Sequence, residues 1–342
     1  MNVDFYFRKK IPVAILGATG LVGQKFVELL ANHPWFEIDT LVASEKSAGK
    51  KYGEAVDWKM ATPLPQQIAS MPVRAYTTKL DVSVCFSALD SSVAKTLERE
   101  LADAGYAVIS NTSSHRMDPD VTLVVPEVNP EHLDLVKDKK GFIVTNPNCV
   151  VIGLVMALKP LVDQYGVEAV HVSTMQAISG AGLQGALLDV DDNVIPYIAD
   201  EESKVESEPK KILSAPDLVI SAHCNRVHVS DGHLENLSVR LKKEAVKQDI
   251  IDMWNSFRGE PQGLQLPSAP ANPLIYHPEE DQPQPKKTRH LEKGMAVSIG
   301  RLRPCPNFGW KFSILSHNTV RGAAGCAVLN AEMLVKRGLL FW

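Results

Sequence analysis

One stretch decides the fold of this 342-residue chain: Ile11-Pro12-Val13-Ala14-Ile15-Leu16-Gly17-Ala18-Thr19-Gly20-Leu21-Val22-Gly23. Its first six residues form a short apolar run typical of a buried parallel strand, and residues 24–32 carry a helical pattern. A glycine-rich turn between strand and helix lets the backbone approach a pyrophosphate at the helix N-terminus. The GxxGxxG spacing is a variant of the dinucleotide fingerprint, and its place directly after the first strand favours that reading over a purely structural turn. The predicted cofactor contacts are Gly17, Ala18, Thr19, Gly20, Leu21 and Val22.

Alternating strands and helices continue beyond this turn. Strands are expected at 37–43, 82–87, 107–110 and 123–125, and a helix at 92–104. Such alternation predicts an open, mostly parallel, Rossmann-like sheet. Ligands gather at the carboxyl ends of strands in these sheets, which makes the end of the 82–87 strand and the residue after the 107–110 strand further candidate contacts. These candidates are Ser87, Ala88, Leu89 and Asn111.

The loop after the second strand favours NADP over NAD. An acidic residue there would hydrogen-bond the ribose 2′-OH and repel a 2′-phosphate, but Ser44 occupies the position. Hydroxyls and lysines that would accept the phosphate follow closely. They are Lys46, Ser47, Lys50 and Lys51, while Glu45 is the opposing observation and an ordinary solvated loop is the alternative.

A cysteine stands at a second strand-to-helix junction. The strand-like run 141–145 ends at the turn Asn146-Pro147-Asn148, and an apolar helix is expected from Cys149 onward. Unpaired backbone N–H groups and the helix dipole stabilise a thiolate at a helix N-terminus. Cys149 is therefore a candidate nucleophile, with a buried structural cysteine as the alternative.

The remainder of the chain predicts a second, α+β domain. Four segments alternate as half-buried strands do, at 169–177, 236–241, 295–302 and 310–316, consistent with a mixed or antiparallel sheet covered on one face by helices. The proline- and glutamine-rich stretch 260–289 is expected to be an irregular connection. A helix of small residues from 318 to about 336 is expected to pack against the first domain. The predicted division is 1–148 with 318–342 for the nucleotide-binding domain and 149–317 for the catalytic and dimerisation domain.

Composition excludes several classes of protein. The chain is 45% hydrophobic and 22% charged, with a net charge of -4, which gives no electrostatic footprint for nucleic acid. No apolar run approaches the ~18 residues of a membrane span, and residues 1–10 lack the apolar core of a signal peptide, so a cytoplasmic location without membrane contact is expected. The five scattered cysteines suggest neither a disulfide framework nor a metal site.

Taken together, the motifs closely resemble the aspartate-β-semialdehyde dehydrogenase family, in its archaeal and fungal branch. The resemblance runs from about Pro12 to Gly338. It rests on the two turns above, Gln176-Ala177-Ile178-Ser179-Gly180-Ala181-Gly182, the segment Arg226 to His233, and the segment Asn318 to Ala324. The family implies reversible, NADPH-dependent reductive dephosphorylation of L-β-aspartyl phosphate through a cysteine thioester, a step in the synthesis of lysine, threonine, methionine and isoleucine. It also implies a homodimer or homotetramer.

The resemblance assigns roles to individual residues. Cys149 would be the nucleophile and His233 the acid–base group, with His228 as a rival histidine. Arg226 would hold the substrate carboxylate, Glu208 would face the ammonium, and Lys211 and Arg116 would hold the phosphate. Asn148 and Gln176 would orient the thioester. Ser179, Gly180 and Asn318 would lie along the cofactor.

Three other functions were weighed from the sequence. A malonyl-CoA reductase would use the same cysteine chemistry, but its substrate has no ammonium for Glu208 to meet. An N-acetyl-glutamyl-phosphate reductase is expected to show glycine before the cysteine and Tyr-Pro after it, where this chain has Asn148 and Val150-Val151. A non-catalytic NADP-binding regulator would not need to keep nucleophile, acid–base group and substrate cations together.

Overall fold

A computed structural model describes residues 9–340, without the side chains of Ala186 and Leu187. The chain divides into two compact units. Unit 1 contains the described residues up to Thr122, then 133–146 and the residues from Asn330 onward, and unit 2 contains 123–132 and 147–329. The structural division therefore falls at 146/147 and 329/330, whereas the sequence placed boundaries at 148/149 and 317/318. Among residues 9–340, no helix has the length and apolar character needed to cross a membrane.

Unit 1 is built on a seven-stranded sheet of order β3-β2-β1-β4-β5-β7-β6. The strands β3, β2, β1, β4, β5 and β7 run parallel, and β6 lies at the edge beside β7. The strands are β1 (Ile11–Leu16), β2 (Phe36–Val42), β3 (Val73–Arg74), β4 (Val84–Ser87), β5 (Ala107–Ser110), β6 (Thr122–Leu123) and β7 (Phe142–Thr145). The helices are α1 (Leu21–Leu30), α2 (Tyr52–Ala55), α3 (Gln66–Ala69), α4 (Ser91–Asp103) and the 3-10 helix η2 (Pro130–Val136), which crosses from unit 2.

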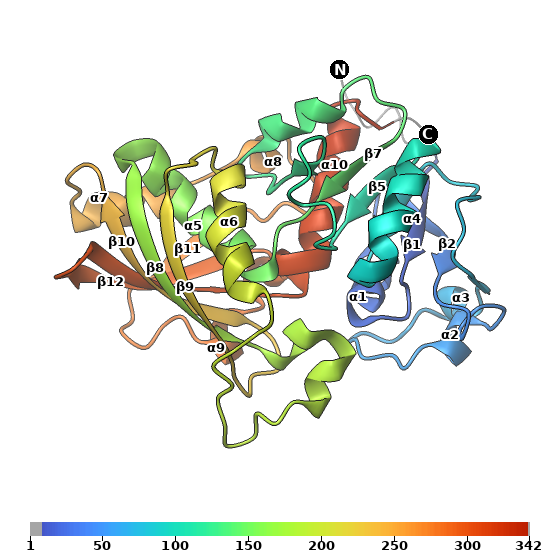
Figure 1. Ribbon diagram of the computed structural model, residues 1–342, viewed down its shortest axis with the longest axis horizontal. Helices are drawn as coiled ribbons and strands as arrows, with labels where there is room; N and C mark the ends of the chain where they lie inside the picture. Colours follow the sequence, from blue (N-terminus) through green and yellow to red (C-terminus); the bar gives the residue numbers. More distant parts are fainter. Residues whose placement is uncertain (1–8, 341–342) are drawn as a thin grey trace. The chain divides into compact units, whose positions relative to one another are not determined.

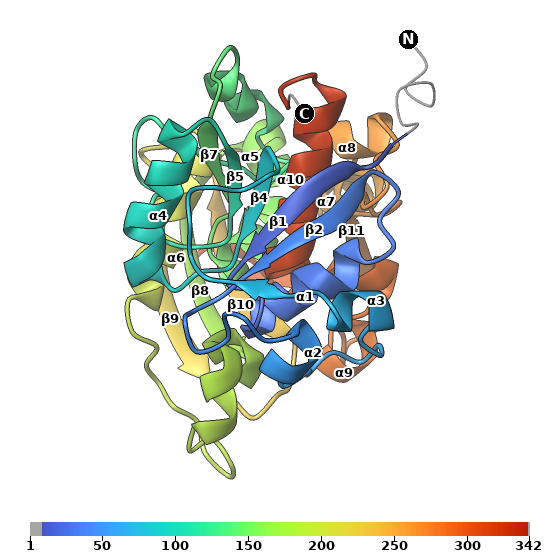
Figure 2. The ribbon, with the colours of Figure 1, turned by 90° about the vertical axis from the view of Figure 1, so that its right-hand side faces the viewer.

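The order of the strands reverses at β1. From β1 the chain moves outward through β2 and β3, then returns to pair β4 on the other side. The helices α1 and α4 consequently cover opposite faces of the sheet (Figure 2). A reversal of this kind opens a crevice at the carboxyl ends of the two central strands. The predicted α/β, Rossmann-like class is confirmed.

Unit 2 is built on a six-stranded mixed sheet of order β11-β12-β13-β10-β8-β9, grouped at the left of Figure 1. The outer pairs β11 with β12 and β8 with β9 are parallel, and the three pairings between them are antiparallel. The strands are β8 (Val167–Gln176), β9 (Val219–Arg226), β10 (His233–Leu241), β11 (Leu274–His277), β12 (Val297–Cys305) and β13 (Gly309–Ser316). The helices are α5 (Cys149–Tyr165), η3 (Ile178–Leu187), α6 (Glu201–Ile212), α7 (Lys247–Ser256), α8 (Glu260–Gly263), α9 (Pro285–Thr288), η4 (Leu291–Gly294), the π-helix η5 (Val320–Ala324) and α10 (Gly325–Lys336), which continues into unit 1.

Helix α5 forms the centre of the unit 2 core. Every residue from Val150 to Leu158 is buried, and these side chains pack with those of β8, β10, β12 and β13. A helix that is apolar on all sides must be enclosed on all sides. The nucleophile candidate therefore stands at the end of a deeply buried helix, whose position is fixed by packing.

The edge strand β9 is protected by helix α6. Glu202 Oε1 accepts a hydrogen bond from Cys224 N at 3.0 Å, and Glu206 Oε1 accepts one from Ala222 N at 3.0 Å. An unprotected edge strand presents unpaired N–H groups to other chains. The two glutamates accept hydrogen bonds from N–H groups of this strand, and they also join α6 to β9 at the edge of the sheet.

Two predictions about unit 2 were wrong. The stretch 260–289 contains strand β11 and the one-turn helices α8 and α9, because parallel pairing with β12 satisfies a four-residue strand whose prolines lie outside it. Strand β9 was not predicted, although Ser221, His223 and Asn225 alternate along it with the buried Ile220, Ala222 and Cys224. The C-terminal helix begins as the π-helix η5 and then continues as α10.

Candidate active site

Four buried polar side chains form a row across one end of the unit 2 sheet. Arg226 on β9 pairs with Gln176 on β8, and His233 on β10 pairs with Ser316 on β13. Leu234 pairs with Met175, which places His233 beside Gln176. The four are at most 5% exposed. The register therefore brings residues from four strands together beneath the N-terminus of α5.

Cys149 is the first residue of α5, as the sequence predicted. The preceding Asn148 caps the helix: its Oδ1 accepts a hydrogen bond from Val150 N at 2.9 Å. The thiol is half-buried and lies at the positive end of a 17-residue helix. The site thus offers a thiolate both stabilisation and access.

His233 contacts the thiol directly. Its Nε2 lies 3.2 Å from Cys149 Sγ, and its Nδ1 accepts a hydrogen bond from Ala177 N at 3.0 Å. Burial, reinforced by the positive charge of Arg226 and by His317, lowers the pKa of His233 to about 3. The rival His228 is 60% exposed and lies 3.3 Å from Asp191, at the surface.

Arg226 and Gly180 complete the wall beside this pair. Arg226 Nη1 donates to the carbonyl of Ala177 at 2.6 Å, which fixes the guanidinium. Burial lowers the pKa of Arg226 below its ordinary value, while Cys149 and Glu201 oppose the shift. A Cβ at Gly180 would lie 2.7 Å from Arg226 Nη1 and 3.1 Å from His233 Cε1. Glycine at this position leaves room for the two side chains.

In unit 1 the predicted phosphate-binding turn follows β1 with the required geometry. Gly17 has a φ of +76°, and a Cβ there would lie 2.4 Å from the carbonyl oxygen of Ala88. The turn and the end of β4 are therefore adjacent, as predicted. A Cβ at Gly23 would lie 2.1 Å from Gly17 O, so α1 packs closely on the turn.

Comparison with known proteins identifies the family. Residues 12–136 match the family described as semialdehyde dehydrogenase, NAD binding domain, and residues 158–321 match semialdehyde dehydrogenase, dimerisation domain. The chain is 45% identical to an aspartate-semialdehyde dehydrogenase of Archaeoglobus fulgidus, covering 96% of this chain and 99% of the relative. It is 41% identical to that of Saccharomyces cerevisiae, covering 97% and 99%.

The chain belongs to the aspartate-semialdehyde dehydrogenase family.

Solved structures of the aspartate-semialdehyde dehydrogenase family share the fold. The enzyme of Candida albicans, crystallised with NADP, superposes with a TM-score of 0.90 at 39% identity, covering 97% of this chain and 100% of that one. Enzyme II of Vibrio cholerae, complexed with ASA, gives 0.78 at 28% identity, covering 96% and 99%. The resemblance seen in the sequence is confirmed, including its archaeal and fungal relatives.

Two buried glutamates hold the turn before Cys149 in this family member. Glu208 Oε2 accepts from Asn148 N at 2.6 Å, and Glu201 Oε1 accepts from Asn148 Nδ2 at 2.9 Å. They stand seven residues apart on one face of α6, and Lys211 lies half-buried one turn after Glu208. Glu201 was not foreseen, because it lies in a run of charged residues that reads as a solvated helix face.

A second polar row lies below the first. Glu235 on β10 pairs with Thr174 on β8, which pairs with Cys224 on β9. Glu235 is fully buried, and no described residue hydrogen-bonds its carboxyl. Burial, followed by the charge of Glu201, raises its pKa well above the ordinary range.

The π-helix η5 lies against Cys149. A Cβ at Gly322 would lie 2.9 Å from Cys149 Cβ and 3.1 Å from its carbonyl oxygen. Segments of π-helix occur preferentially at functional sites. Near this helix, Asn318 Nδ2 donates to Ser179 Oγ at 2.9 Å, and Asn318 Oδ1 accepts from Gly232 N at 2.8 Å. The structure thus brings the predicted cofactor residues Ser179 and Asn318 together within unit 2.

Two unforeseen side chains secure the nucleotide turn of unit 1. Tyr52 is fully buried and donates from its hydroxyl to Ala18 O at 2.8 Å. Gln24 donates to Thr19 O at 3.0 Å and accepts from Lys59 N at 2.8 Å. Both reach the turn from outside the fingerprint, and no sequence pattern marks them. Ser44 and Ser47 lie in the turn after β2, where Ser47 N donates to Ser44 O at 2.9 Å.

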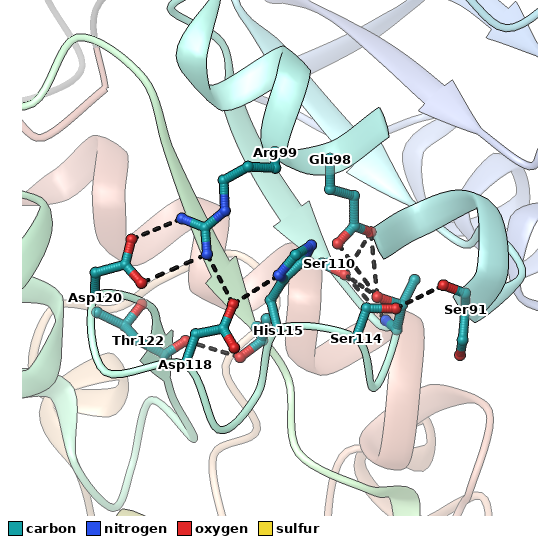
Figure 3. Close-up of polar contacts among 11 residues, drawn as sticks. Ser91, Glu98, Arg99, Ser110, Ser114, His115, Asp118, Asp120 and Thr122 are labelled. Atoms are coloured by element: carbon teal, nitrogen blue, oxygen red, sulfur yellow. Dashed lines mark hydrogen bonds and ion pairs between the residues drawn. The ribbon is translucent and has the colours of Figure 1, made fainter. Parts of the chain in front are cut away.

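The loop that carries Arg116 is tied to helix α4 (Figure 3). Arg99 forms ion pairs with Asp118 at 2.7 Å and Asp120 at 2.6 Å, and His115 Nδ1 lies 2.8 Å from Asp118. Arg116 itself is 7% exposed, and its Nη2 donates to Asn111 O at 3.0 Å. These contacts hold the loop against α4 within unit 1.

Proposed function

We propose that the chain catalyses the reversible, NADPH-dependent reductive dephosphorylation of L-β-aspartyl phosphate to L-aspartate β-semialdehyde. The observation that carries the proposal is the 3.2 Å contact between Cys149 Sγ and His233 Nε2 at the start of α5, next to the guanidinium of Arg226. Membership of the aspartate-semialdehyde dehydrogenase family supports the substrate, because the relatives carry this name over almost the full chain.

Cys149 is the proposed nucleophile. Its thiolate attacks the acyl carbon, a C–S bond forms, and the C–O bond to phosphate breaks with the electron pair leaving on phosphate. The resulting thioester is then reduced to the aldehyde. The first of these two steps requires an ionised sulfur. Cys149 stands at a helix N-terminus and beside the cation Arg226, and both features favour the thiolate over the thiol.

Arg226 is proposed to bind the substrate carboxylate, because its orientation is fixed and a planar fork binds a carboxylate in bidentate fashion. Asn148 and Gln176 are proposed to orient the thioester. Glu208 is proposed to face the substrate ammonium while it also accepts from Asn148 N. Lys211 and Arg116 are proposed to hold the phosphate.

NADP is the proposed cofactor, and the turn after β1 fits a pyrophosphate. Gly17 adopts a conformation that other residues rarely adopt, and α1 begins four residues later, at Leu21. The cofactor supplies the hydride that reduces the thioester. Residues proposed to hold it are Gly17, Ala18, Thr19, Gly20, Leu21, Val22, Ser44, Ser47, Ser87, Ala88, Ser179, Gly180 and Asn318. The absence of a carboxylate at Ser44 supports NADP, and the Candida albicans relative was crystallised with it.

A homodimer or homotetramer is proposed as the assembly. The matched dimerisation domain covers residues 158–321, which include all six strands of the mixed sheet and the second half of helix α5. Val219, an apolar residue at the start of the edge strand β9 of this sheet, is 60% exposed. Sedimentation of the purified protein distinguishes dimer, tetramer and monomer.

The decisive assay is phosphate-dependent reduction of NADP with L-aspartate β-semialdehyde. Malonate semialdehyde with coenzyme A, and NAD as acceptor, are run in parallel. We expect turnover only with aspartate semialdehyde, phosphate and NADP. Turnover only with the coenzyme A pair would keep Cys149 but remove the roles of Glu208, Lys211 and Arg226, and silence in every combination would leave a nucleotide-binding protein.

Cys149→Ala is expected to abolish turnover and to leave NADP binding nearly unchanged, because the thiol forms the covalent intermediate and the nucleotide turn lies in unit 1. Cys149→Ser is expected to retain a trace, since an alkoxide forms far less readily than a thiolate. Steady-state rates and fluorescence titration with NADPH measure both quantities. Full activity of the alanine variant would disprove the covalent mechanism.

A further inference from the structure

Glu201 is a buried carboxylate close to the turn that precedes Cys149. It is the first residue of α6 and is 7% exposed. Its Oε1 accepts a hydrogen bond from Asn148 Nδ2 at 2.9 Å, and within residues 9–340 no donor or cation is bound to its Oε2. A carboxylate removed from water is costly unless a cation or several donors compensate it. Glu201 therefore retains the capacity to bind a positively charged group.

Helix α6 runs along β9 so that its first turn lies toward the strand end that carries Arg226. Glu206 and Glu202, one turn apart, accept from backbone N–H groups two residues apart on β9, and the earlier glutamate bonds the later strand residue. One helical turn and two strand residues each advance about 6 Å, so helix and strand are antiparallel and in step. Glu201, at the start of the helix, is consequently near the end of β9 where Arg226 stands.

The charge of Glu201 acts on the guanidinium of Arg226. Burial lowers the pKa of Arg226, and the negative charges of Cys149 and Glu201 oppose that shift. Burial also raises the pKa of Glu235, and the charge of Glu201 adds to the increase. Coulomb interactions of this kind decrease with distance, so Glu201 and Arg226 lie near each other although they form no ion pair. The two elements thus present opposite charges side by side.

An α-amino acid carries its carboxylate and its ammonium on one carbon, so the groups that bind them must lie close together. Arg226 is the proposed partner of the carboxylate. An ammonium has three N–H donors and can contact more than one acceptor. Glu208 supplies one carboxylate, whose Oε2 also accepts from Asn148 N at 2.6 Å. Glu201 supplies another, with Oε2 still available.

We propose that Glu201 is a second ammonium-binding carboxylate of the substrate site, which together with Arg226 holds the zwitterionic end of the substrate and rejects acyl compounds that lack the amino group. The inference rests on the proposed function for the identity of the substrate. A compound without an ammonium would leave the carboxylate of Glu201 buried and unpaired, and a penalty of this kind produces specificity.

Two semialdehydes that differ only in the amino group test this role. L-Aspartate β-semialdehyde carries an ammonium, and succinate semialdehyde has hydrogen in its place. Glu201→Gln removes the charge but keeps an oxygen that can accept from Asn148 Nδ2. We expect kcat/KM for L-aspartate β-semialdehyde to fall about ten- to a hundredfold, the loss of one hydrogen bond between charged groups, and kcat/KM for succinate semialdehyde to change by less than about threefold. Slow turnover of the second compound is measured with enzyme in excess.

Glu202→Gln is the matched control, because it makes the same change one residue further along α6 and keeps the acceptor for Cys224 N. Its kcat/KM for each semialdehyde should equal that of the natural chain. Equal losses for the two semialdehydes in Glu201→Gln would overturn the inference, since they would mean that Glu201 acts only by holding Asn148.

Protection of Cys149 from alkylation gives a second reading that needs no turnover. Iodoacetamide labels the thiol, and mass spectrometry of the peptide that contains Cys149 measures the rate. The competing ligands are L-aspartate and succinate, which again differ only in the amino group. We expect L-aspartate to protect the natural chain at a concentration about tenfold or more below that of succinate, and the two acids to protect Glu201→Gln alike.

A preference for L-aspartate that survives in Glu201→Gln would overturn the inference. A natural chain that shows this preference but does not turn over L-aspartate β-semialdehyde would contradict the proposed function, while the ammonium site at Glu201 would stand.

Discussion

Cys149 can occupy its position because Gly322, which lies against it, has no side chain. A Cβ 2.9 Å from Cys149 Cβ forces one of the two backbones to move. We expect Gly322→Ala to lower kcat by about ten- to a hundredfold with a folded chain, since displacement of a reacting group by ~1 Å has effects of this size. Steady-state kinetics and circular dichroism test this.

The matched control is Gly263→Ala on α8, where a Cβ would meet no atom within 4 Å. It is expected to leave both activity and fold unchanged. Equal rates for the two variants would show that η5 does not position the nucleophile.

Glu235 makes stability depend on pH. The folded chain keeps this carboxyl protonated at pH values where the unfolded chain releases the proton, because burial raises its pKa. Stability is therefore highest below the ordinary carboxyl pKa and falls as pH rises toward the folded-state pKa. We expect the melting temperature of Glu235→Gln, relative to the natural chain, to increase steadily from acid to neutral pH.

Glu37→Gln on β2 is the control for that experiment, since Glu37 is exposed. Its melting temperature should follow the natural chain at every pH. A constant offset of Glu235→Gln across the whole range would show that Glu235 does not titrate abnormally.

The sequence pointed to the candidate site residues better than to the residues that support them. Cys149 was found because a turn, a cysteine and an apolar helix are local features. The register that places Arg226, Gln176 and His233 in one row arises from pairing between distant strands. Glu201, which also holds the turn, resembles any surface glutamate until α6 is docked on β9.

Helix α6 protects the edge of the second sheet by side-chain acceptors. We expect Glu202→Ala with Glu206→Ala to speed amide exchange at Ala222 and Cys224 by about five- to tenfold, the loss of one hydrogen bond at each amide. Hydrogen-exchange mass spectrometry or NMR measures the rates.

Lys204→Ala, on the same helix, is the comparison for α6 and should leave both amides unchanged. If exchange in the double variant matches that of Lys204→Ala, the strand is protected by something other than these glutamates.

The elements themselves were predictable where their pattern was strong: β1 was located at its observed bounds, Ile11–Leu16. Strands β9 and β11 were not predicted. Each is defined by its pairing with a neighbouring strand, β8 and β12 respectively, and not by its amino-acid composition.

Unit 2 depends on an ion pair that joins the segment 123–132 to η5. Arg321 Nη1 donates to Glu127 Oε1 at 2.9 Å within a bidentate pair, and both side chains are fully buried. Glu127→Gln leaves a buried guanidinium without its anion, at a cost of about 3–5 kcal/mol. We expect the melting transition to fall by roughly 10 °C in calorimetry.

The surface pair of Arg99 and Asp120 in unit 1 offers the contrast, because Asp120 is 57% exposed. Asp120→Asn should cost at most about 1 kcal/mol, since water screens exposed ion pairs. Comparable losses in the two variants would mean that burial adds nothing to the Glu127 pair.

The last residues of the chain also set the order in which it can be made. Glu332 Oε1 lies 2.7 Å from His33 Nε2, and Asn330 Nδ2 donates to Asn146 Oδ1 at 2.8 Å, so the first unit is closed by residues translated after the whole of unit 2. Synthesis at about 5–20 residues per second leaves an interval on the order of 10 to 40 s between Asn146 and Glu332. During that interval the nascent first unit lacks the contacts that Asn330 and Glu332 make. A ribosome stalled before Asn330 would therefore display an unfinished N-terminal half, the kind of chain that holding chaperones retain.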